Sequence, residues 1–449
     1  VQYYAGIWIE NSNGRGWAEY RDMSATGFRN RWYRLRDLGY RLVDYEIYPS
    51  ASGYRYAGVW RQNSERPNWS LKDAVDARVQ TELDTFGVPG IGVAIAQSGE
   101  IKYMRGFGFQ DADAGVWYSA RTINRLASVA KAVTGVLAVK LQSDGEITDL
   151  DNATSTLVGA LPGHHTHTLR QLLANRGGVG HYADHGTPNG SYNSALEASQ
   201  AFWNDALPYA PGTNCIYSTH GYTIVGAALE SATGQPVEDI LVNEIGAPYG
   251  LPTLRVEDVS VADDNRSRVY NDAGAEATPD NIYWKAYGGG QEASAYDLVR
   301  FGMKVLDDTI LNGDERTELW SVPAPTPCLG LDGRNQSGYA LGWDTGTDQG
   351  TQVVAKGGNQ LGANTYIRIY PEHDIVIVVL ANRDGGGHST PQLGRDIGTL
   401  MLNELAEADS PATPYVLNGL AHYVLGAAQA FHNTLGQLVV SEFDATGDA

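Results

Sequence analysis

The spacing of apolar side chains near the start of the chain predicts a small unit of helix and strand. Phe28, Trp32 and Leu35 recur at helical spacing. This pattern stops at Gly39, and apolar and polar side chains then alternate over residues 40–45, which is typical of a strand. The sequence therefore predicts a helix followed by a strand in this region.

A different pattern begins at Leu71 and predicts a larger α/β domain. Residues 71–86 fit an amphipathic helix, and residues 92–96 and 101–106 form a plausible hairpin around a Ser-Gly turn. A second pair of apolar strands covers residues 365–370 and 375–381. Because strands at both ends enclose a long helical and loop-rich middle, we expect one sheet assembled from distant pieces of the chain.

The first segment also contains an internal repeat at an offset of 52 residues. Tyr-Ala-Gly-Ile-Trp at residues 4–8 returns as Tyr-Ala-Gly-Val-Trp at residues 56–60, and Trp17 matches Trp69. We interpret residues 1–69 as one strand–helix–strand repeat plus the start of a second. Such a unit is either a minimal module docked on the next domain or what is left of a longer array. The alternative is that its aromatic residues simply form a core.

Charge is divided unevenly between the two parts. The 449 residues carry a formal net charge of −20, yet residues 1–69 hold ten Arg, no Lys and seven acidic residues, so that segment is +3 and the rest is −23. An acidic chain argues against nucleic acid or an anionic membrane as the main partner. With 42% hydrophobic and 10% aromatic residues, intrinsic disorder is excluded.

These changes predict three regions: a repeat module at residues 1–69, the α/β domain at residues 70–408, and a C-terminal extension of unassigned role at residues 409–449. No apolar run approaches the roughly 18 residues of a membrane span. The start at Val1 shows neither an initiator Met nor a signal peptide, so we expect a soluble chain that is either mature or a fragment. The two cysteines, Cys215 and Cys328, exclude a disulfide scaffold and leave a single disulfide open.

The first motif with chemical potential pairs Ser128 with Lys131 at the start of an apolar helical stretch. At a spacing of three residues, the two side chains share one helix face. A serine hydroxyl needs a base beside it, and a lysine amine becomes one when burial and neighbouring cations depress its pKa. Alone, the pair also fits an ordinary solvated helix.

Two further motifs follow along the chain. Tyr217 lies in a turn-rich segment before an apolar stretch and can move a proton if a nearby cation lowers its pKa; otherwise it is a half-buried tyrosine. Lys356 ends a strand-like run and is followed by Gly357 and Gly358. Two glycines let a substrate backbone approach closely, although a β-turn explains them as well.

Together, the three motifs resemble in order and context the serine β-lactamase and D-alanyl-D-alanine peptidase superfamily, in particular its class C-like branch. Supporting stretches include residues 168–173, 289–298, 339–343 and 378–383, and the resemblance covers roughly residues 71–405. It implies a β-lactamase/transpeptidase-like α/β (α+β) fold, in which helices flank an antiparallel sheet and a helical region is inserted.

The resemblance also implies roles for individual residues. Ser128 would be the acyl-forming nucleophile, Lys131 its base and Tyr217 the proton relay to the leaving group. Lys356 would maintain their protonation states and attract a substrate carboxylate. The backbone amides of Ser128 and Asn359 would form the oxyanion hole.

Two positions depart from the family pattern and bear on substrate binding. Thr219 stands where the family usually has Asn, which weakens or changes one contact to a substrate amide. Arg176 lies in a segment that is normally a small hydroxyl-rich turn, and it adds a cation near the cleft. Both changes put lactam hydrolysis in doubt and leave acyl-enzyme chemistry in place. With Gly357 and Gly358, these residues form the expected substrate-binding set.

The aromatic segment, residues 2–69, resembles the repeats of polyglycine hydrolases, secreted peptidases that cut glycine-rich linkers of plant chitinases.

Residues 164, 165 and 167 are His, but without further ligands at zinc spacing we expect a solvated loop and no metal or cofactor. Five N-glycosylation sequons, at Asn68, Asn152, Asn189, Asn265 and Asn335, fit a secreted protein.

The sequence thus predicts a secreted serine peptidase for glycine-rich or D-alanyl peptides, with a peptide or protein as its partner. A class C-like β-lactamase or carboxylesterase is the alternative among enzymes. A binding or sensor protein that has lost turnover is the alternative of another class.

Overall fold

The computed structural model describes residues 16–62, 69–182, 191–323 and 336–409, together with short segments at 414–417, 420–425, 428–432 and 438–441. The chain divides into two compact units, Val1–Gly394 and Arg395–Ala449. Among the described residues, no helix combines the length and the apolar character that a membrane span requires.

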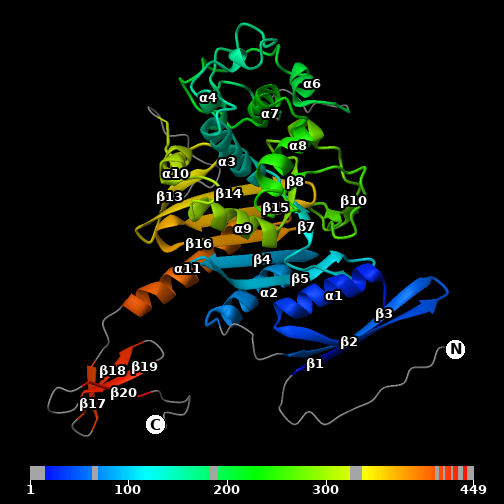
Figure 1. The fold of residues 1–449 in the computed structure, drawn as a ribbon, viewed down its shortest axis with the longest axis vertical. Coiled ribbons are helices and arrows are strands. Elements are labelled where there is room, and N and C mark those ends of the chain that lie inside the picture. Colours follow the sequence, from blue (N-terminus) through cyan, green and yellow to red (C-terminus); the bar gives the residue numbers. More distant parts are fainter. Residues whose placement is uncertain are drawn as a thin grey trace. The chain divides into compact units, whose positions relative to one another are not determined.

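An eight-stranded antiparallel sheet forms the centre of the first unit (Figure 1). Its strand order is β12-β13-β14-β15-β16-β4-β5-β6. Strands from the two ends of the domain meet where β16 pairs with β4, which confirms the expected sheet of distant pieces. The strands are β4 (Gly90–Gln97), β5 (Glu100–Asp111), β6 (Val116–Trp117), β12 (Gln336–Tyr339), β13 (Asp344–Asp348), β14 (Thr351–Gln360), β15 (Ala363–Tyr370) and β16 (Ile375–Ala381).

Both predicted strand pairs are present. Strands β4 and β5 form the first hairpin, and its turn residues Ser98 and Gly99 have φ angles of 52° and 74°. Positive φ at both central residues is the geometry that a two-residue hairpin needs. Strands β15 and β16 form the second pair, joined by the 3₁₀ turn η4 (Pro371–His373).

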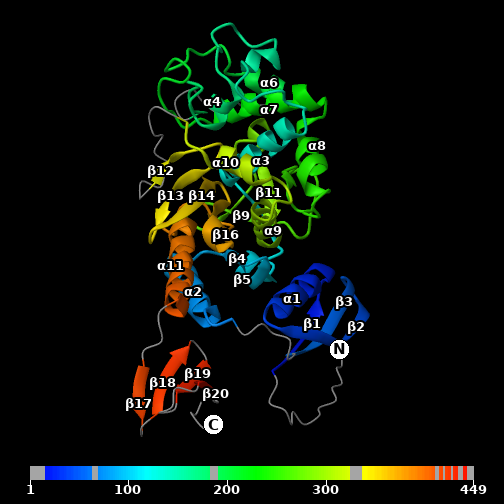
Figure 2. The same cartoon turned by 60° about the vertical axis from the view of Figure 1, so that its left-hand side comes forward.

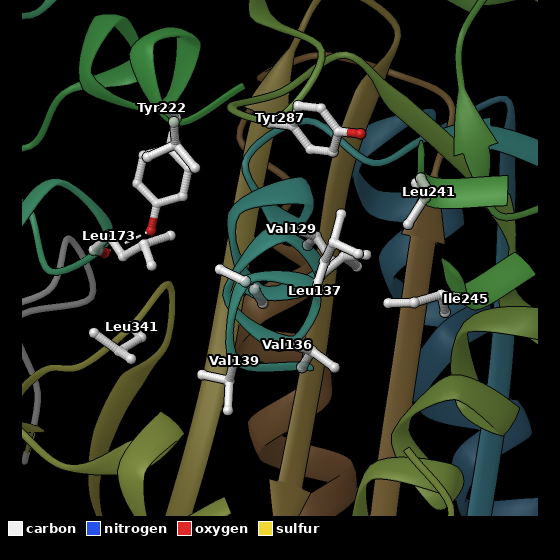
Figure 3. Close-up of a cluster of buried hydrophobic side chains, with 14 of the residues drawn as sticks. Val129, Val136, Leu137, Val139, Leu173, Tyr222, Leu241, Ile245, Tyr287 and Leu341 are labelled. Carbon is white, nitrogen blue, oxygen red and sulfur yellow. Dashed lines mark hydrogen bonds between the residues drawn. The ribbon is translucent and has the colours of Figure 1, made fainter. Parts of the chain in front are cut away.

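Helices cover the two faces of this sheet (Figure 2). Helices α3 and α9 pack on one face, and α2, which the sequence predicts over 71–86, packs against β4 and β5. Helix α3 is buried along nearly its whole length, and apolar side chains of other elements lie on either side of it (Figure 3). The helices of this domain are α2 (Lys72–Phe86), α3 (Val129–Ser143), α4 (Leu169–Leu173), α6 (Ala195–Gln200), α7 (Thr219–Thr233), α8 (Val237–Leu241), α9 (Ala295–Leu306) and α10 (Gly313–Trp320).

Smaller elements connect the sheet to the helical region. Strands β7, β11 and β8 form a three-stranded sheet in the order β7-β11-β8, and β9 pairs with β10. The remaining elements are β7 (Ile123–Arg125), β8 (Arg255–Val256), β9 (Val269–Tyr270), β10 (Glu276–Ala277), β11 (Gln291–Ser294), and the short helical turns η1 (Thr154–Thr156), η2 (Val242–Gly246) and η3 (Tyr283–Lys285).

The repeat module is a three-stranded antiparallel sheet with one helix. It contains β1 (Trp17–Met23), α1 (Ala25–Asp37), β2 (Tyr40–Ser50) and β3 (Gly53–Gln62), with β3 in the centre. The segment predicted to open a second repeat, residues 56–60, therefore completes the sheet of the first. Its matching segment, residues 4–8, lies outside the described residues.

Aromatic side chains form the core of this module, while others stay exposed. Phe28, Leu35 and Trp60 make up the buried cluster, and the rings of Phe28 and Trp60 lie 5.6 Å apart. Tyr45 and Tyr54 of the same sheet are 60% and 71% exposed. The core interpretation therefore accounts for only part of the aromatic set.

Arginines of α1 connect the module to the sheet of the large domain. The guanidinium of Arg34 lies 3.8 Å from the centre of the Trp117 ring in β6, a cation–π contact. Arg121 forms a salt bridge of 2.8 Å with the buried Asp37 at the end of α1. The module is thus docked on the large domain through its helix.

The second unit contains the end of α11 (Thr390–Asp409) and a four-stranded sheet in the order β17-β18-β19-β20. Its strands are β17 (Pro414–Leu417), β18 (Leu420–Leu425), β19 (Ala428–His432) and β20 (Leu438–Ser441).

Candidate active site

Ser128 lies at the N-terminal end of α3, directly before its first residue. The preceding turn is fixed from two sides: the Leu126 amide donates to the Gln291 carbonyl at 2.8 Å, and the Thr365 hydroxyl donates to the Leu126 carbonyl at 2.6 Å. Ala127 has a positive φ of 47°, a strained conformation for a residue with a side chain. The chain therefore accepts local strain in order to present Ser128.

Lys131 lies one turn further along α3, and its amine contacts three oxygens. The Nζ atom is 3.3 Å from Ser128 Oγ, 3.1 Å from Thr219 Oγ1 and in short contact with the Gly288 carbonyl. A neutral amine has two N–H groups and one lone pair. If the N–H groups face Gly288 and Thr219, the lone pair is left for the Ser128 hydroxyl proton. This arrangement suits a general base.

The environment of Lys131 favours the neutral form. Burial lowers its pKa well below the ordinary value, and the charges of Lys356 and Lys285 lower it further. The side chain is 0% exposed, and it has no salt bridge to any described carboxylate. Desolvation and like charges act in the same direction here, so the free amine is the form that the fold stabilises.

Tyr217 precedes α7 by two residues and lies between the two lysines. The centre of its ring is 4.8 Å from Lys131 Nζ and 5.2 Å from Lys356 Nζ. Its hydroxyl is buried and makes no hydrogen bond of regular geometry within the described chain, although Ser128 is close enough to lower its pKa. Burial outweighs Lys356 and Ser128 and raises the pKa overall, so the expected lowering by a cation does not prevail.

Lys356 occupies β14 and is also buried, at 1% exposure. Its Nζ lies 3.4 Å from Asp344 Oδ2 on the neighbouring strand β13. Burial alone would lower the pKa of Lys356, but the Asp344 carboxylate outweighs it and raises the pKa. Lys356 is therefore a permanent cation whose charge is already paired within the protein.

The two glycines after Lys356 continue β14, which pairs with β15 through residue 360, so they do not form a turn. Their roles differ. A Cβ on Gly358 would lie 2.7 Å from both Ser128 N and the Leu126 carbonyl, whereas a Cβ on Gly357 would meet its nearest neighbour, Pro391, at 3.4 Å. Gly358 is thus required for the close approach of β14 to the Ser128 turn, and Gly357 points to the opposite face of the sheet.

Asn359 follows on β14, and its side chain is held in place at the edge of the site. Its amide donates to Asp384 Oδ1 at 2.5 Å and accepts from Asn364 Nδ2 at 2.9 Å. Ser128 N lies beside Gly358, the residue before Asn359. The two backbone segments that the family resemblance assigns to the oxyanion hole are therefore adjacent.

The two departures from the family pattern have different surroundings. The Thr219 hydroxyl is buried and faces Lys131, so it contacts the amine rather than standing free for a substrate amide. Arg176 is 1% exposed, and its guanidinium makes no hydrogen bond within the described chain. The structure shows no contact between Arg176 and Ser128 or Lys131.

Two residues of this site escape the sequence analysis. Asp344, the partner of Lys356, directly follows the motif at residues 339–343, and a lone acid opening a strand carries little signal. Lys285 ends the short turn η3 and lowers the pKa of Lys131 from a distant position in the chain. Only the fold brings these two residues to the site.

His165 and His167 belong to the core, so the expected solvated loop is wrong for these two, whereas His164 is exposed as expected. His165 and His167 are 3% and 0% exposed, and His165 Nδ1 lies 2.9 Å from His167 Nε2. Burial lowers the pKa of His167 to about 3. In the part of the chain that the structure describes, no three His, Cys, Asp or Glu side chains are placed to hold a metal ion.

Family models match both parts of the chain. A model described as beta-lactamase matches residues 75–398, and a model described as polyglycine hydrolase-like structural repeat matches residues 14–63. The second match covers β1 to β3 as a single unit, in agreement with the observed three-stranded module.

Curated relatives align with the large domain. Protein flp of Staphylococcus aureus (strain COL) is 23% identical over 343 residues, which covers 73% of this chain and 66% of that protein. The chain thus spans slightly less than two thirds of the length of that relative. The mouse mitochondrial serine beta-lactamase-like protein LACTB is 24% identical, covering 64% of this chain and 70% of that protein.

Solved structures share the fold at low sequence identity. A penicillin-binding protein homologue from Pyrococcus abyssi has a TM-score of 0.63 at 20% identity and covers 82% of this chain and 89% of its own. The D-amino acid amidase of Ochrobactrum anthropi has a TM-score of 0.64 at 19% identity, covering 76% and 100%. EstCE1, a hydrolase with promiscuous acyltransferase activity, has a TM-score of 0.62 at 20% identity, covering 73% and 98%.

Proposed function

Because the chain belongs to the beta-lactamase family and has the fold of its serine hydrolases, we propose that it forms an acyl-enzyme on Ser128 and cleaves glycine-rich or D-alanyl peptide bonds. The observation that carries the proposal is the contact between Ser128 and a buried, unpaired Lys131. A serine beside a desolvated amine is an activated nucleophile.

The proposed reaction has two halves, the acylation of Ser128 and its deacylation by water. Ser128 Oγ attacks the carbonyl carbon and passes its proton to Lys131 Nζ. The C–N bond breaks, and the proton held by Lys131 passes through Tyr217 to the leaving amine, so Lys131 is neutral again. Water then attacks the resulting ester and gives a proton to Lys131, which passes it to Ser128 Oγ as the ester C–O bond breaks; a carboxylic acid is released and Ser128 is restored. The amides of Ser128 and Asn359 stabilise the oxyanion in both halves.

The repeat module supports a glycine-rich peptide as the substrate. The match to the polyglycine hydrolase-like repeat lies in the same chain as the beta-lactamase domain and precedes it. A substrate strand of glycines presents only backbone groups. It could be added as a strand along the end of β14 beyond Ala355, where β13 no longer pairs with β14.

We also propose that the protein works outside the cell. Cys215 is disulfide-bonded, and disulfides persist in oxidising compartments. The sequon residue Asn152 is exposed and therefore accessible to glycosylation.

An active-site serine probe with intact-mass detection tests the chemistry. We expect one adduct on the wild-type protein and none on Ser128→Ala, with Ser143→Ala on the same helix as the matched control. Absence of an adduct on the wild type, with ligand binding retained, would establish the sensor alternative.

Parallel incubation with an oligoglycine peptide, a D-Ala-D-Ala peptide and a short-chain nitrophenyl ester tests the substrate class. We expect cleavage of at least one peptide. Turnover of the ester alone would replace the peptidase proposal with the esterase alternative.

A further inference from the structure

Lys285 is a largely buried lysine beside the site, and no described carboxylate is bonded to its ammonium. The residue is 9% exposed, and its ammonium makes neither a hydrogen bond nor a salt bridge to any described group. Burial lowers its pKa to about 8. Burying a charged side chain costs free energy unless the charge is paired, so a bonded carboxylate would stabilise this ammonium.

The acids nearest to Lys285 are already engaged by another cation. Arg125 Nε binds Glu257 Oε1 at 3.0 Å, and Arg125 Nη1 binds Asp280 Oδ1 at 2.6 Å. These two carboxylates act to raise the pKa of Lys285. Burial and the charge of Arg125 act to lower it, and the net result is a lowered pKa. Both carboxylates are thus bonded to Arg125, and neither is bonded to Lys285.

The position of Lys285 relative to Ser128 follows from strand β14. Lys356, Gly358 and Gln360 alternate onto one face of this strand, and Gly358 is the member that approaches Ser128. Gln360 Nε2 donates to the Gly289 carbonyl at 3.1 Å, and a Cβ on Gly289 would lie 3.5 Å from Lys285 Cδ. Lys285 is therefore at the Gln360 end of the strand.

Lys356 and Lys285 consequently flank Ser128 from opposite ends. Two residues along a strand span about 6.6 Å, so Lys356 and Gln360 are each about that far from Gly358. Tyr217, the proposed relay to the leaving group, lies at the Lys356 end. On the proposed mechanism, the Gln360 end faces the acyl portion of the substrate.

The two cations also differ in availability. Lys356 is paired with Asp344 and has little charge left for a substrate anion. Lys285 has none of its charge taken up by a bonded carboxylate, and the rings of Tyr182 and Trp284 lie 6.0 and 5.6 Å from its Nζ. These rings lie in cation–π contact with the ammonium, to which no described carboxylate is bonded.

We propose that Lys285 binds a carboxylate on the acyl side of the substrate, so that the enzyme prefers peptides with an anionic group before the scissile bond. This inference rests on the proposed function for the direction of the substrate. It moves the anion-binding role that the sequence assigned to Lys356 onto a residue which the sequence did not indicate.

Binding to the inactive Ser128→Ala protein tests the proposal without turnover. Succinyl-triglycine amide and acetyl-triglycine amide differ by one carboxylate, and calorimetry gives their dissociation constants. We expect the succinyl peptide to bind at least tenfold more tightly. Adding Lys285→Met should abolish this ratio, and Lys285→Arg should retain part of it. Lys102→Met, on the β5 hairpin, is the matched control and should leave the ratio unchanged.

Three results would overturn the inference: equal binding of the two peptides, binding of neither, or a preference that survives Lys285→Met. Circular dichroism melting of each variant separates a binding effect from a folding defect, and Lys285→Gln replaces Lys285→Met if the latter fails to fold. Failure of the proposed function gives a different result, since the wild type would then form no adduct and cleave no peptide while the succinyl preference persists.

Discussion

Lys131 and Lys356 are two buried lysines that face the same tyrosine, yet their pKa values move in opposite directions. Both lose hydration, which favours the neutral amine. The difference is Asp344, which binds Lys356 at 3.4 Å, whereas the oxygens bonded to Lys131 are neutral and the charges that act on it are cations. One carboxylate therefore decides which lysine acts as a base and which remains a cation.

The largest expected effect comes from removing the base. Lys131→Met should lower kcat/KM by about 10³- to 10⁴-fold, at the upper end of what general-base catalysis contributes. Lys140→Met, on the same helix and paired with Asp144, should leave kcat/KM unchanged. Steady-state kinetics with the peptide that the parallel incubation identifies measures kcat/KM of both variants. Full activity of Lys131→Met would contradict the assignment of Lys131 as the general base.

Removing the acid should make the two lysines alike. Asp344→Asn leaves Lys356 buried without a counterion, and breaking a buried pair in this way costs about 3–5 kcal/mol. Asp144→Asn removes the partly exposed partner of Lys140 and should cost about 1 kcal/mol or less. Urea denaturation measures the free energies of unfolding. Equal costs for the two variants would show that Asp344 does not hold Lys356 as a cation.

Adjacent glycines allow the backbone of the site to be tested apart from the lysines. Gly358→Ala places a Cβ against Ser128 N and should lower kcat by about 10²- to 10³-fold, the loss expected when an oxyanion donor is displaced. Gly357→Ala points to the other face and should retain activity of the same order. A serine-probe labelling rate compares them. Equal labelling rates for the two variants would contradict the claim that the close approach of β14 to Ser128 requires a glycine at position 358.

The smallest effect is a pH dependence of stability. The folded protein lowers the pKa of Lys131, so between that value and the unfolded value of about 10.5 the unfolded chain binds more protons. The wild-type free energy of unfolding should therefore rise with pH, relative to Lys131→Met, across this window. Denaturation series at several pH values in both proteins measure the difference. A difference that is flat or falls with pH would contradict a depressed pKa.

The sequence predicted the parts of the fold that depend on local pattern. Hairpin β4–β5, strands β15 and β16 and helix α2 follow from apolar spacing and turn residues, and the family resemblance supplied the rest of the architecture. The sequence also assigned residues 56–60 to the opening of a second repeat, whereas they lie in β3, the central strand of the module. Its position depends on pairing with both β1 and β2, which no local pattern reveals.

For the site, motif spacing brought forward Ser128, Lys131, Tyr217 and Lys356, and the fold places these four side chains together. Motif spacing could not indicate the residues that set the charges of these side chains. Asp344 and Lys285 act through space on residues far from them in the chain, and their effect depends on burial and on which acids Arg125 already binds. Electrostatic balance of this kind exists only in the folded protein.

The most direct test of the central claim is the titration of the two amines themselves. NMR of the lysine Cε–Hε groups, assigned with Lys131→Met and Lys356→Met, follows each amine as pH changes. The account predicts that Lys131 titrates well below 10.5 and Lys356 above 10.5. Two ordinary titrations near 10.5, or the reverse order, would contradict it.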